Sequence, residues 1–556
     1  MKKRLLFLAA CCIQLAAQSQ VVQIEQLNTI QGADTDNIVE IAKDNSGNIF
    51  VAGVLANGTQ DMDFGAGVAN LSSTNGNPFV SKYDANSNLI WTKIFSSSDL
   101  ATCKGIHVDD AGAVYIFGQY GYSIDADPGA GTHTLSFAGL DAYLIKLNTN
   151  GNLIWAANLN CPYGFINDVA VKGDQLYAVG EYGYYADLNP GAGTNSVTSS
   201  DLMDGFMIEL DTASQFQSAV TFEGTGYQAV KTIAISSTGN IHIGGEFENT
   251  IFFVQNSNVL TMNSNGNSDV FIMNYDNSFS LTNYFSFGSD DKEGIHKIKL
   301  DNSDDVYVSG YFSDTIDFDP SGNVVEKICN GGYDAYISKF SSNGTFQWNY
   351  TYGGLSYYDN IYDFDFSGNT IYLASECSGQ VDFDPGAAVE QFSGVGTSVI
   401  VKIGTNGVYQ HAMDMGSGNG GGWINPRTIF IDNNADIHVG GMYNYTPSFV
   451  SYTNTQNAPT AAGYDGFWVR YSEVNNVGVN ENHRQQLNLF PNPANDIIYL
   501  NGISNGNYFI YNSEGKLIRN STLSNSTLPI SDLSPGIYIL QFQTKENLST
   551  ARFIKQ

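Results

Sequence analysis

Basic side chains are scarce in this sequence of 556 residues, where 24 Lys and Arg stand against 55 Asp and Glu for a formal net charge of −31. Without a cationic surface to neutralise phosphates, nucleic acid and anionic membranes are poor partners. Charged residues make up only 14% of the chain, while glycine occupies 58 positions and aromatic residues account for 13%. This composition argues against disorder and a coiled coil and favours strands and turns. Metal cations or neutral ligands suit the acidic surface better.

Long apolar runs are absent apart from a short one at the N-terminus. A cationic start (residues 2–4) precedes an apolar run from Leu5 to Ala17, which is too short to span a bilayer. This order predicts a secretory signal peptide over residues 1–19, with cleavage before Gln20. A lipoprotein signal is the alternative, because residues 8–11 resemble a lipobox, although only six apolar residues precede Cys11. We expect no transmembrane segment and a mature protein that is soluble or peripherally attached.

Cysteine is also rare. The cysteines beyond the expected signal peptide are Cys103, Cys161, Cys329 and Cys377. They form no CxxC pair and lack histidines at zinc spacing, which argues against a zinc site. Two disulfides between neighbouring repeats, Cys103–Cys161 and Cys329–Cys377, are one interpretation for an exported protein. Four separate thiols are the other, and the sequence does not choose between them.

An apolar strand that ends in a small residue, nearly always glycine, recurs seven times. We call its last residues the marker residues: Gly53, Gly118, Gly180, Gly245, Gly310, Ser375 and Gly441, spaced by 62 to 66 positions. Each repeat shows four short strands, which in the second repeat are 105–108, 114–117, 142–147 and 153–155. Helical periodicity is absent, so a helical solenoid is excluded. Four strands in a repeat of this length are typical of a β-propeller blade.

The ends of the repeat region predict how the ring closes. The seventh repeat stops after its third strand at Tyr471, whereas an unassigned apolar strand, Val21 to Leu27, precedes the first repeat. We therefore expect an all-β fold, with a seven-bladed β-propeller over residues 20–474 whose N-terminal strand pairs into the last blade and covers its edge. A polar linker follows over residues 475–486. The recurring Gly, Asp-Ala-Tyr and Asn-Gly-x-x-x-Trp positions resemble the bacterial SBBP-type propeller repeat.

Residues 487–556 differ in character from the rest. Residues 485–556 hold five Lys and Arg and four Asp and Glu, against 16 and 51 in residues 5–484. Alternating strands with Pro and Gly at their ends predict a small antiparallel β-sandwich. The Pro-Asn-Pro entry at 491–493, the Glu-Gly-Lys turn at 514–516 and the Leu-x-Pro-Gly-x-Tyr segment at 533–538 resemble the C-terminal sorting domain of the type IX secretion system of Bacteroidetes. The resemblance implies the type IX machinery as a partner and a secreted or cell-surface location outside the outer membrane.

An Asp-x-Asp motif follows the marker residue by seven or eight positions in five repeats, with Asn in the second place in one of them. Its acidic residues are Asp61, Asp63, Asp125, Asp127, Asp187, Asp317, Asp319, Asp382 and Asp384. In an extended segment, side chains at i and i+2 share a face, and the turn that follows exposes carbonyls beside them. Such oxygens are the ligands that Ca²⁺ prefers, so one interpretation is a calcium site in each loop. The alternative is that the aspartates cap the turn, because the fuller Asp-x-Asp-x-Asp-Gly loop is missing.

Support for catalysis is weak. Residues 20–474 contain only Arg427 and Arg470, too few for the arginine cluster of sialidase-like enzymes, and no GxSxG, HExxH or P-loop motif is present. Tyrosines follow the marker residues and are interpreted either as platforms for sugars or proteins or as packing between blades: Tyr120, Tyr122, Tyr182, Tyr184 and Tyr185. We expect a non-enzymatic binding or adhesion module for a glycan or protein. The alternatives are a hydrolase or lyase that acts on polysaccharides through acidic residues at the propeller mouth, and a structural surface-layer component.

Overall fold

The computed structural model describes residues 21–474 and 489–556, except for positions 33, 200, 256–257, 357, 387–388, 417–421, 452, 501–505, 513–515, 524–525 and 544–547. The expected signal peptide (1–19) and linker (475–486) lie outside the described residues. The described chain is built from strands and contains no helix, which confirms the all-β class. No helix long and apolar enough to cross a membrane occurs in the part of the chain that the structure describes. Contacts separate residues Val21–Val474, here the ring unit, from the C-terminal residues, here the tail unit.

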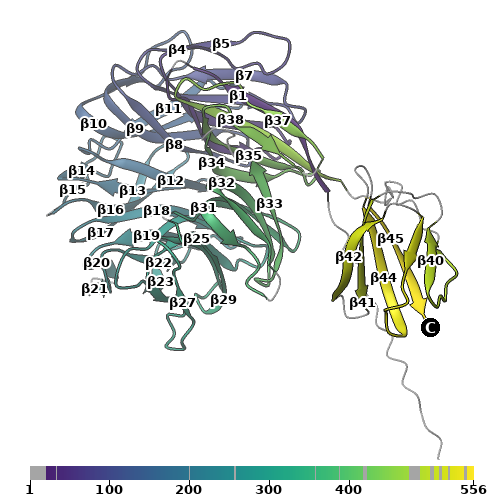
Figure 1. Ribbon diagram of the computed structural model, residues 1–556. Helices are drawn as coiled ribbons and strands as arrows, with labels where there is room; N and C mark the ends of the chain where they lie inside the picture. Colours follow the sequence, from purple (N-terminus) through teal and green to yellow (C-terminus); the bar gives the residue numbers. More distant parts are fainter. Residues whose placement is uncertain are drawn as a thin grey trace, which may run out of the picture. The chain divides into compact units, whose positions relative to one another are not determined.

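The ring unit consists of seven antiparallel sheets that each contain four strands from one repeat, or, in the seventh, from both ends of the repeat region (Figure 1). The first three contain, in order, β2 (Asn37–Lys43), β3 (Ile49–Leu55), β6 (Asn77–Tyr83) and β7 (Leu89–Ile94); β8 (Ala101–Val108), β9 (Val114–Asp125), β10 (Thr134–Leu147) and β11 (Leu153–Asn158); and β12 (Phe165–Lys172), β13 (Gln175–Tyr182), β16 (Asp204–Asp211) and β17 (Phe216–Thr225).

The remaining four sheets repeat this order. They contain β18 (Gln228–Ile235), β19 (Ile241–Phe247), β22 (Asp269–Tyr275) and β23 (Leu281–Phe287); β24 (Gly294–Leu300), β25 (Val306–Phe312), β28 (Asp334–Phe340) and β29 (Phe346–Tyr352); β30 (Asn360–Ser367), β31 (Thr370–Asp382), β32 (Gln391–Gly404) and β33 (Tyr409–Gly416); and β34 (Ile424–Ile431), β35 (Ile437–Asn444), β38 (Tyr464–Val474) and β1 (Val21–Ile30).

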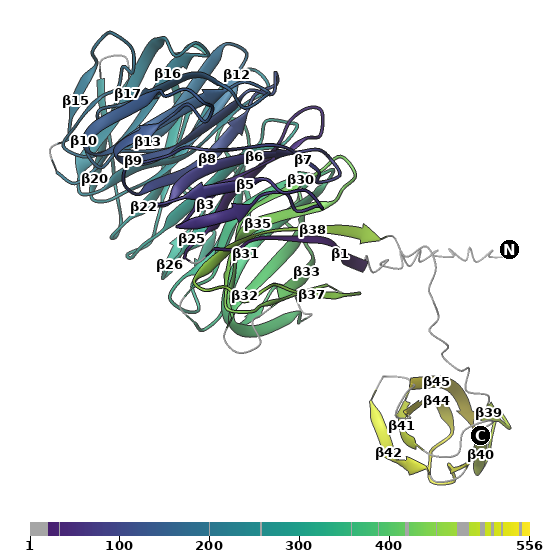
Figure 2. The same ribbon diagram turned by 90° about the horizontal axis from the view of Figure 1, so that it is seen from above.

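The first strand of each sheet, here an inner strand, contacts the inner strand of the next sheet. These contacts run from β2 through β8, β12, β18, β24, β30 and β34 and back to β2, so they close a ring. Strand β1 pairs antiparallel with β38, from Val21 opposite Val474 to Ile30 opposite Gly466 (Figure 2). The N-terminal strand therefore completes the last sheet, as its position in the sequence predicts, and supplies backbone partners to an edge that would otherwise be open.

The hydrophobic core of the ring unit lies between neighbouring sheets. One cluster joins Phe117 and Leu144 of the second sheet to Ile166 and Phe206 of the third. Another cluster joins Trp468 of the last sheet to Val51 and Tyr83 of the first, so the same packing continues across the point where the ring closes. Because each sheet buries both of its faces in this way, the strands read as nearly continuous apolar runs rather than as an alternating pattern.

Small hairpins connect the second and third strands at the outer part of five sheets. They are β4 (Gly58–Asp61) with β5 (Asn70–Ser73), β14 (Tyr185–Asp187) with β15 (Ser196–Thr198), β20 (Thr250–Gln255) with β21 (Asn258–Asn263), β26 (Thr315–Asp317) with β27 (Glu326–Ile328), and β36 (Ser448–Val450) with β37 (Thr455–Asn457). In the second and sixth sheets, long strands take the place of a separate hairpin. The hairpin β20–β21 also pairs with β17, so it extends the third sheet to six strands.

The tail unit folds as two antiparallel sheets around one core. One sheet has the order β39 (Leu489–Phe490), β40 (Ile497–Leu500) and β43 (Thr527–Pro529), and the other β42 (Leu517–Leu523), β41 (Gly506–Asn512), β44 (Gly536–Gln543) and β45 (Leu548–Lys555). Ile498, Ile510, Leu528, Leu540 and Phe553 are fully buried between the two sheets. The small antiparallel sandwich expected from the sequence is therefore present.

Candidate functional site

The Asp-x-Asp motifs lie at the ends of the second strands or of their hairpins, and the residue between the two acidic positions anchors each loop. These middle residues, Met62, Ala126, Leu188, Phe318 and Phe383, have exposed fractions of 0%. The flanking carboxylates therefore lie on the opposite, outer side of the segment, as the alternation of an extended chain requires. Tyr83 and Tyr350 fix two of the loops by donating their hydroxyls to the carbonyls of Met62 and Phe383.

The carboxylates of these motifs accept hydrogen bonds from the backbone of their own loops. Asp317 Oδ1 accepts from the N–H groups of Asp319 and Val325 at 3.0 and 2.8 Å, and Asp319 Oδ1 accepts from Ser321 at 2.9 Å. The same bonds recur at Asp61, Asp63, Asp125, Asp127, Asp187, Asp382 and Asp384. The turn role is thus visible in the structure. Within the described residues no group of three or more His, Cys, Asp or Glu is placed to hold a metal ion, and calcium at these loops stays a prediction.

Each inner strand carries a β-bulge at the same place, which turns one extra side chain towards the centre of the ring. The register shifts leave one residue unpaired in every inner strand, and these bulge residues are Val39, Lys104, Asn167, Lys231, His296, Tyr362 and Arg427. A bulge re-aims side chains and interrupts pairing, and bulges often occur next to functional sites. The residues after them, which we call the joint residues, are Glu40, Gly105, Asp168, Thr232, Lys297, Asp363 and Thr428.

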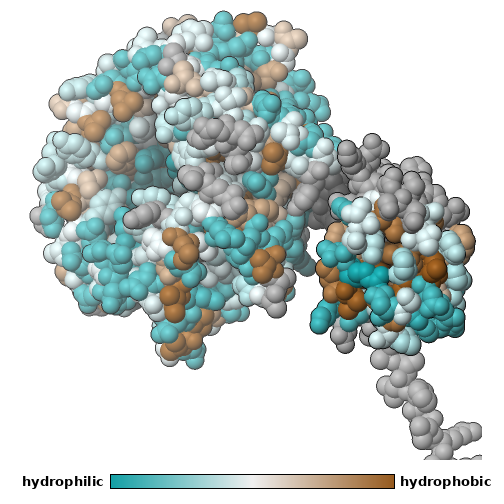
Figure 3. Space-filling model, in the orientation of Figure 1, coloured by the Kyte–Doolittle hydropathy of each residue, from teal (hydrophilic) through white to brown (hydrophobic). Residues whose placement is uncertain are grey.

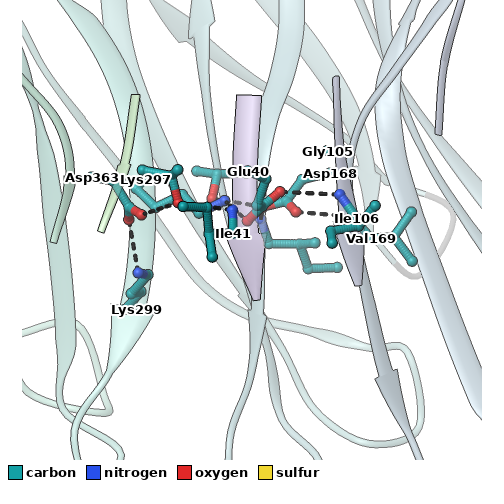
Figure 4. Close-up of polar contacts among 12 residues, drawn as sticks. Glu40, Ile41, Gly105, Ile106, Asp168, Val169, Lys297, Lys299 and Asp363 are labelled. Carbon is teal, nitrogen blue, oxygen red and sulfur yellow. Dashed lines mark hydrogen bonds and ion pairs between the residues drawn. The ribbon is translucent and has the colours of Figure 1, made fainter. Parts of the chain in front are cut away.

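The joint residues link each sheet to the next (Figure 4). Glu40 Oε2 accepts from the N–H of Ile106 at 3.2 Å, and Asp168 Oδ2 accepts from Ile233 at 3.1 Å. Equivalent bonds join Thr232 to Ile298, Asp363 to Ile429, and Thr428 to Ile41. Each bond satisfies a buried backbone donor and fixes the neighbouring sheet, so the ring is held at its centre by side chains as well as by apolar packing.

Two joint residues depart from this rule, and both departures are compensated. Gly105 and Lys297 offer no acceptor to the next sheet. There, the joint aspartate of the next sheet accepts from the N–H of its own neighbour: Asp168 Oδ1 from Val169 at 2.9 Å, and Asp363 Oδ1 from Phe364 at 2.8 Å. A Cβ on Gly105 would lie 2.3 Å from Glu40 Oε2, so glycine is needed for Glu40 to reach across.

The joint residues together form what we call the joint layer, and Lys297 is its cation. Its ammonium lies 3.3 Å from Glu40 Oε1 and interacts with Asp168 and Asp363. Burial opposes protonation of Lys297, but the carboxylates around it outweigh burial and raise its pKa. Burial raises the pKa of Glu40 against the opposing effect of Lys297. Lys299, at 2.7 Å from Asp363 Oδ1, adds a second positive charge beside the layer. One lysine at the centre thus offsets acids from three different sheets.

The bulge residues line a cavity of about 1040 Å³, which also reaches Asn57, Asn75 and Leu100 in the loops of the first two sheets. The sequence of this unit is strongly acidic, yet Lys104, Lys231 and Arg427 all face the cavity. Each cation contacts an aromatic ring, with Lys104 at 4.6 Å from the centre of Phe165, Lys231 at 5.0 Å from Tyr227 and Arg427 at 4.7 Å from Tyr362. The cavity therefore presents cations stacked on aromatic rings beside acidic lining residues such as Glu40, Asp168 and Asp363.

Two glutamates that follow marker residues in the second strands, Glu181 and Glu376, interact with Lys231 and Arg427. Lys231 Nζ lies 3.0 Å from Glu181 Oε2 and 2.6 Å from the hydroxyl of Tyr227. Glu376 accepts hydrogen bonds from Tyr362 at 3.0 Å and from Trp423 and Asn425, and burial raises its pKa.

One further ionisable bulge residue that lines the cavity is His296. Burial lowers the pKa of His296 to about 4, with smaller contributions from Arg427 and Lys231, so its imidazole is neutral at pH 7.

Three exposed tyrosines hold backbone conformations that bulky residues rarely adopt. Four residues after the marker, Tyr122, Tyr184 and Tyr445 have φ of 56°, 61° and 53° and are 60%, 65% and 61% exposed. The same position carries Asn249, Asp314 and Gly379 in other sheets, also with positive φ. Asn, Asp and Gly tolerate this region, whereas a bulky side chain there is an outlier that requires an explanation.

These tyrosines lie on the loops of the face where the cavity opens. Asn57, the residue of the first sheet at the same position, lines the cavity. Tyr163, in the loop before β12, has φ of 62° and is 55% exposed, and its ring centre lies 6.1 Å from that of Tyr184. Of the other tyrosines singled out in the sequence, Tyr120 and Tyr182 are buried, whereas Tyr185 is exposed. Burial supports packing between sheets for Tyr120 and Tyr182, and a platform role for the exposed tyrosines stays a prediction.

The four cysteines Cys103, Cys161, Cys329 and Cys377 are free. The proposed pairings Cys103–Cys161 and Cys329–Cys377 are therefore wrong, and the alternative of four separate thiols holds. Three of the thiols are buried and Cys329 is partly exposed. Apolar burial rather than cross-linking accounts for Cys103 and Cys161, which belong to the core clusters of their sheets.

Sequence reasoning missed the cavity residues and the joint layer, although a signal was present. The joint residues stand 12 or 13 positions before the marker in every repeat. In four of them a charge interrupts an apolar strand, at Glu40, Asp168, Lys297 and Asp363. Because the bulge shifts the alternation by one residue, a pattern of period two does not show which side chain faces the centre.

Comparisons with known proteins bear mainly on the tail unit. A family model described as the secretion system C-terminal sorting domain matches residues 488–556. No curated protein matches the chain. Among solved structures, the chain is similar to PorZ, a surface component of the type IX secretion system of Porphyromonas gingivalis, at 10% identity and a TM-score of 0.20, covering 95% of this chain and 100% of that one.

Two further structures show similarity of the same order. They are a protein of unknown function from Dyadobacter fermentans, at 10% identity with a TM-score of 0.32, covering 82% of this chain and 99% of that one, and a Synechocystis apocarotenoid oxygenase mutant, at 9% identity with a TM-score of 0.33, covering 82% and 96%. Scores this low define neither the fold nor the function of the ring unit. The tail unit, by contrast, is a secretion-system C-terminal sorting domain, and it marks the chain for export to the cell surface or the medium by the type IX machinery.

Proposed function

We propose that the ring unit is a seven-bladed β-propeller of SBBP-type repeats and that the exported protein is a non-enzymatic module that binds a polysaccharide on the face where its cavity opens. The observation that carries this proposal is the set of exposed tyrosines at left-handed positions, Tyr122, Tyr184 and Tyr445. The fold could avoid this backbone strain with Asn or Gly, as it does in other sheets. Avoidable strain of this kind is typical of functional residues.

The arrangement of these rings suits a glycan better than a protein partner. The tyrosines are separated along the face, since they come from the second, third and seventh sheets. Figure 3 shows the hydrophobic residues on the visible side of the ring unit as separate groups among hydrophilic ones. Protein interfaces more often present a contiguous apolar centre, whereas isolated aromatic rings with polar neighbours provide stacking platforms for successive sugars.

A retention assay with a matched set of variants tests this function. The secreted chain, residues 20–556, is passed over immobilised neutral and acidic polysaccharides, and the triple variant Tyr122→Asn, Tyr184→Asn, Tyr445→Asn is compared with it. Because asparagine occupies this position at Asn249 with φ of 56°, the variant should fold without loss of stability. We expect retention to fall at least tenfold.

The control for this assay is Ile90→Asn, which changes an exposed apolar residue on the outermost strand of the first sheet. Its retention should equal that of the unmodified chain. Equal retention of the triple variant and the unmodified chain would contradict the role of the tyrosines. Release of reducing ends or unsaturated sugars from the polymers would instead support the alternative of a hydrolase or lyase, with the acids of the cavity as candidate catalysts.

A further inference from the structure

The cavity at the centre of the ring unit holds two cations that form no ion pair with the described residues. Lys104 is open to the cavity, and its ammonium contacts the Phe165 ring without an ion pair or hydrogen bond to the described residues. Arg427 stacks on Tyr362 and likewise has no ion pair or hydrogen bond there. Lys231, in contrast, is already paired with Glu181. An acidic chain with few cations thus places two of them, unpaired, in one cavity.

These cations lie close enough to repel one another. Burial lowers the pKa of Lys104, Glu181 opposes this shift, and the positive charges of Lys231 and Arg427 add to it. Arg427 and Lys231 act in the same direction on His296. Glu181 and Glu376 offset part of this repulsion, and an anion between Lys104 and Arg427, neither of which forms an ion pair within the described chain, would offset more of it. The arrangement therefore favours an anion bound between Lys104 and Arg427.

We infer that this cavity binds a carboxylate group between Lys104 and Arg427, and that on the proposed function the group belongs to a uronic acid residue of the bound polysaccharide. The planar guanidinium of Arg427 matches a carboxylate in a bidentate geometry, and its stacking on Tyr362 fixes the plane. Glu181 and Glu376 flank the site and repel a dianion such as phosphate more than a single negative charge. The volume of about 1040 Å³ accommodates a sugar ring together with its acid.

The joint layer closes the site on its inner side without competing for the ligand. Its acids are engaged: Glu40 with Ile106 and Lys297, and Asp363 with Ile429 and Lys299. The Lys297 ammonium is likewise held among carboxylates and is not free for an anion. The specificity for the carboxylate therefore rests on Lys104 and Arg427.

Calorimetry with two trisaccharides tests this inference on the full secreted chain. The probes are trigalacturonate and its methyl ester, which share every atom of the sugar backbone but differ in charge. We expect the ester to bind at least tenfold more weakly than the acid. Lys104→Gln and Arg427→Gln should each weaken binding of the acid at least tenfold, raised salt should weaken it further, and both variants should leave binding of the ester unchanged. Lys327→Gln, on the outer hairpin β27, is the control that removes one charge elsewhere.

The outcomes separate this inference from the proposed function. Equal affinity for acid and ester, or charge variants that bind the acid like the unmodified chain, would overturn the carboxylate site while leaving tyrosine-dependent retention of neutral polymers intact. Absence of binding to trigalacturonate with retention of neutral polymers would overturn it as well. If the unmodified chain is retained on no polymer but binds trigalacturonate tightly and in an Arg427-dependent way, the role of the tyrosines is refuted and the carboxylate site in the cavity is supported. Arg427→Lys, which keeps the charge but not the planar fork, should bind the acid with intermediate affinity.

Discussion

Replacing Lys297 by methionine removes the positive charge at the centre of the joint layer but keeps most of the length of the side chain. Glu40, Asp168 and Asp363 then face the same space without their shared counter-ion. Breaking a buried ion pair from one side costs about 3–5 kcal/mol. Here the side chains of Lys297 and Glu40 are 21% and 19% exposed, so cavity water screens part of the loss. We expect Lys297→Met to lower the free energy of unfolding by about 2 kcal/mol.

Thermal unfolding of the full secreted chain measures this loss. A change of 1 kcal/mol shifts Tm by about 2–4 °C in a domain of 150–250 residues and by roughly half as much in a unit of this size, so the expected decrease is about 2–4 °C. Lys327→Met removes the same charge from the outer hairpin β27 and should leave Tm unchanged. Adding Glu40→Gln to Lys297→Met should restore part of the loss, because glutamine still accepts from Ile106 but carries no charge.

The pH dependence of Lys297→Met gives a sharper criterion. Burial raises the folded-state pKa of Glu40, and Lys297 opposes that rise, so removing the lysine moves the pKa of Glu40 further up. A carboxyl whose folded pKa lies above its unfolded value stabilises the fold below the unfolded pKa, and this contribution is lost as pH rises through the folded value. The variant should therefore lose more stability at pH 8 than at pH 5. An equal loss at both pH values would refute the electrostatic reasoning and point to lost packing of the lysine stem.

Three further predictions concern the whole ring unit. Burial raises the pKa of Asp36 and Asp359 to about 7, so the unmodified chain should have a higher Tm at pH 5 than at pH 8, and a rise with pH would contradict the burial of these acids. Asp127→Asn copies the loop of the third sheet, where the uncharged Asn189 accepts the same backbone hydrogen bond. In the presence of chelator this variant should change Tm by less than about 1 °C. A calcium site would instead show as a calcium-dependent rise in Tm that the variant diminishes. Titration with a thiol reagent should modify Cys329 in the native chain and the three buried cysteines only after denaturation, and any disulfide detected by mass would refute the free thiols.

The architecture could be predicted from the sequence because it is encoded many times over. Each repeat supplies the same strand and turn signals, so an error in one is corrected by the other six. The strand Val21–Leu27 was recognisable for the same reason, since the seventh repeat lacks one element that the others have. The disulfide pairings had no such support. Cys103 and Cys161 occur once each, and their burial in separate core clusters could not be derived from their spacing.

The central site was harder to predict because its residues differ where the repeats otherwise agree. The Asp-x-Asp loops use nearly the same residues five times, as expected of elements with a structural task in each sheet. The seven bulge residues, from Val39 to Arg427, belong to six residue types, although every inner strand carries its bulge at the same place. Sevenfold repetition of the backbone with almost no repetition of the side chains gives the cavity one orientation and one charge pattern. A purely structural ring needs no such asymmetry, whereas a site that holds one end of a ligand does, and this contrast favours ligand binding at the centre over a scaffold role alone.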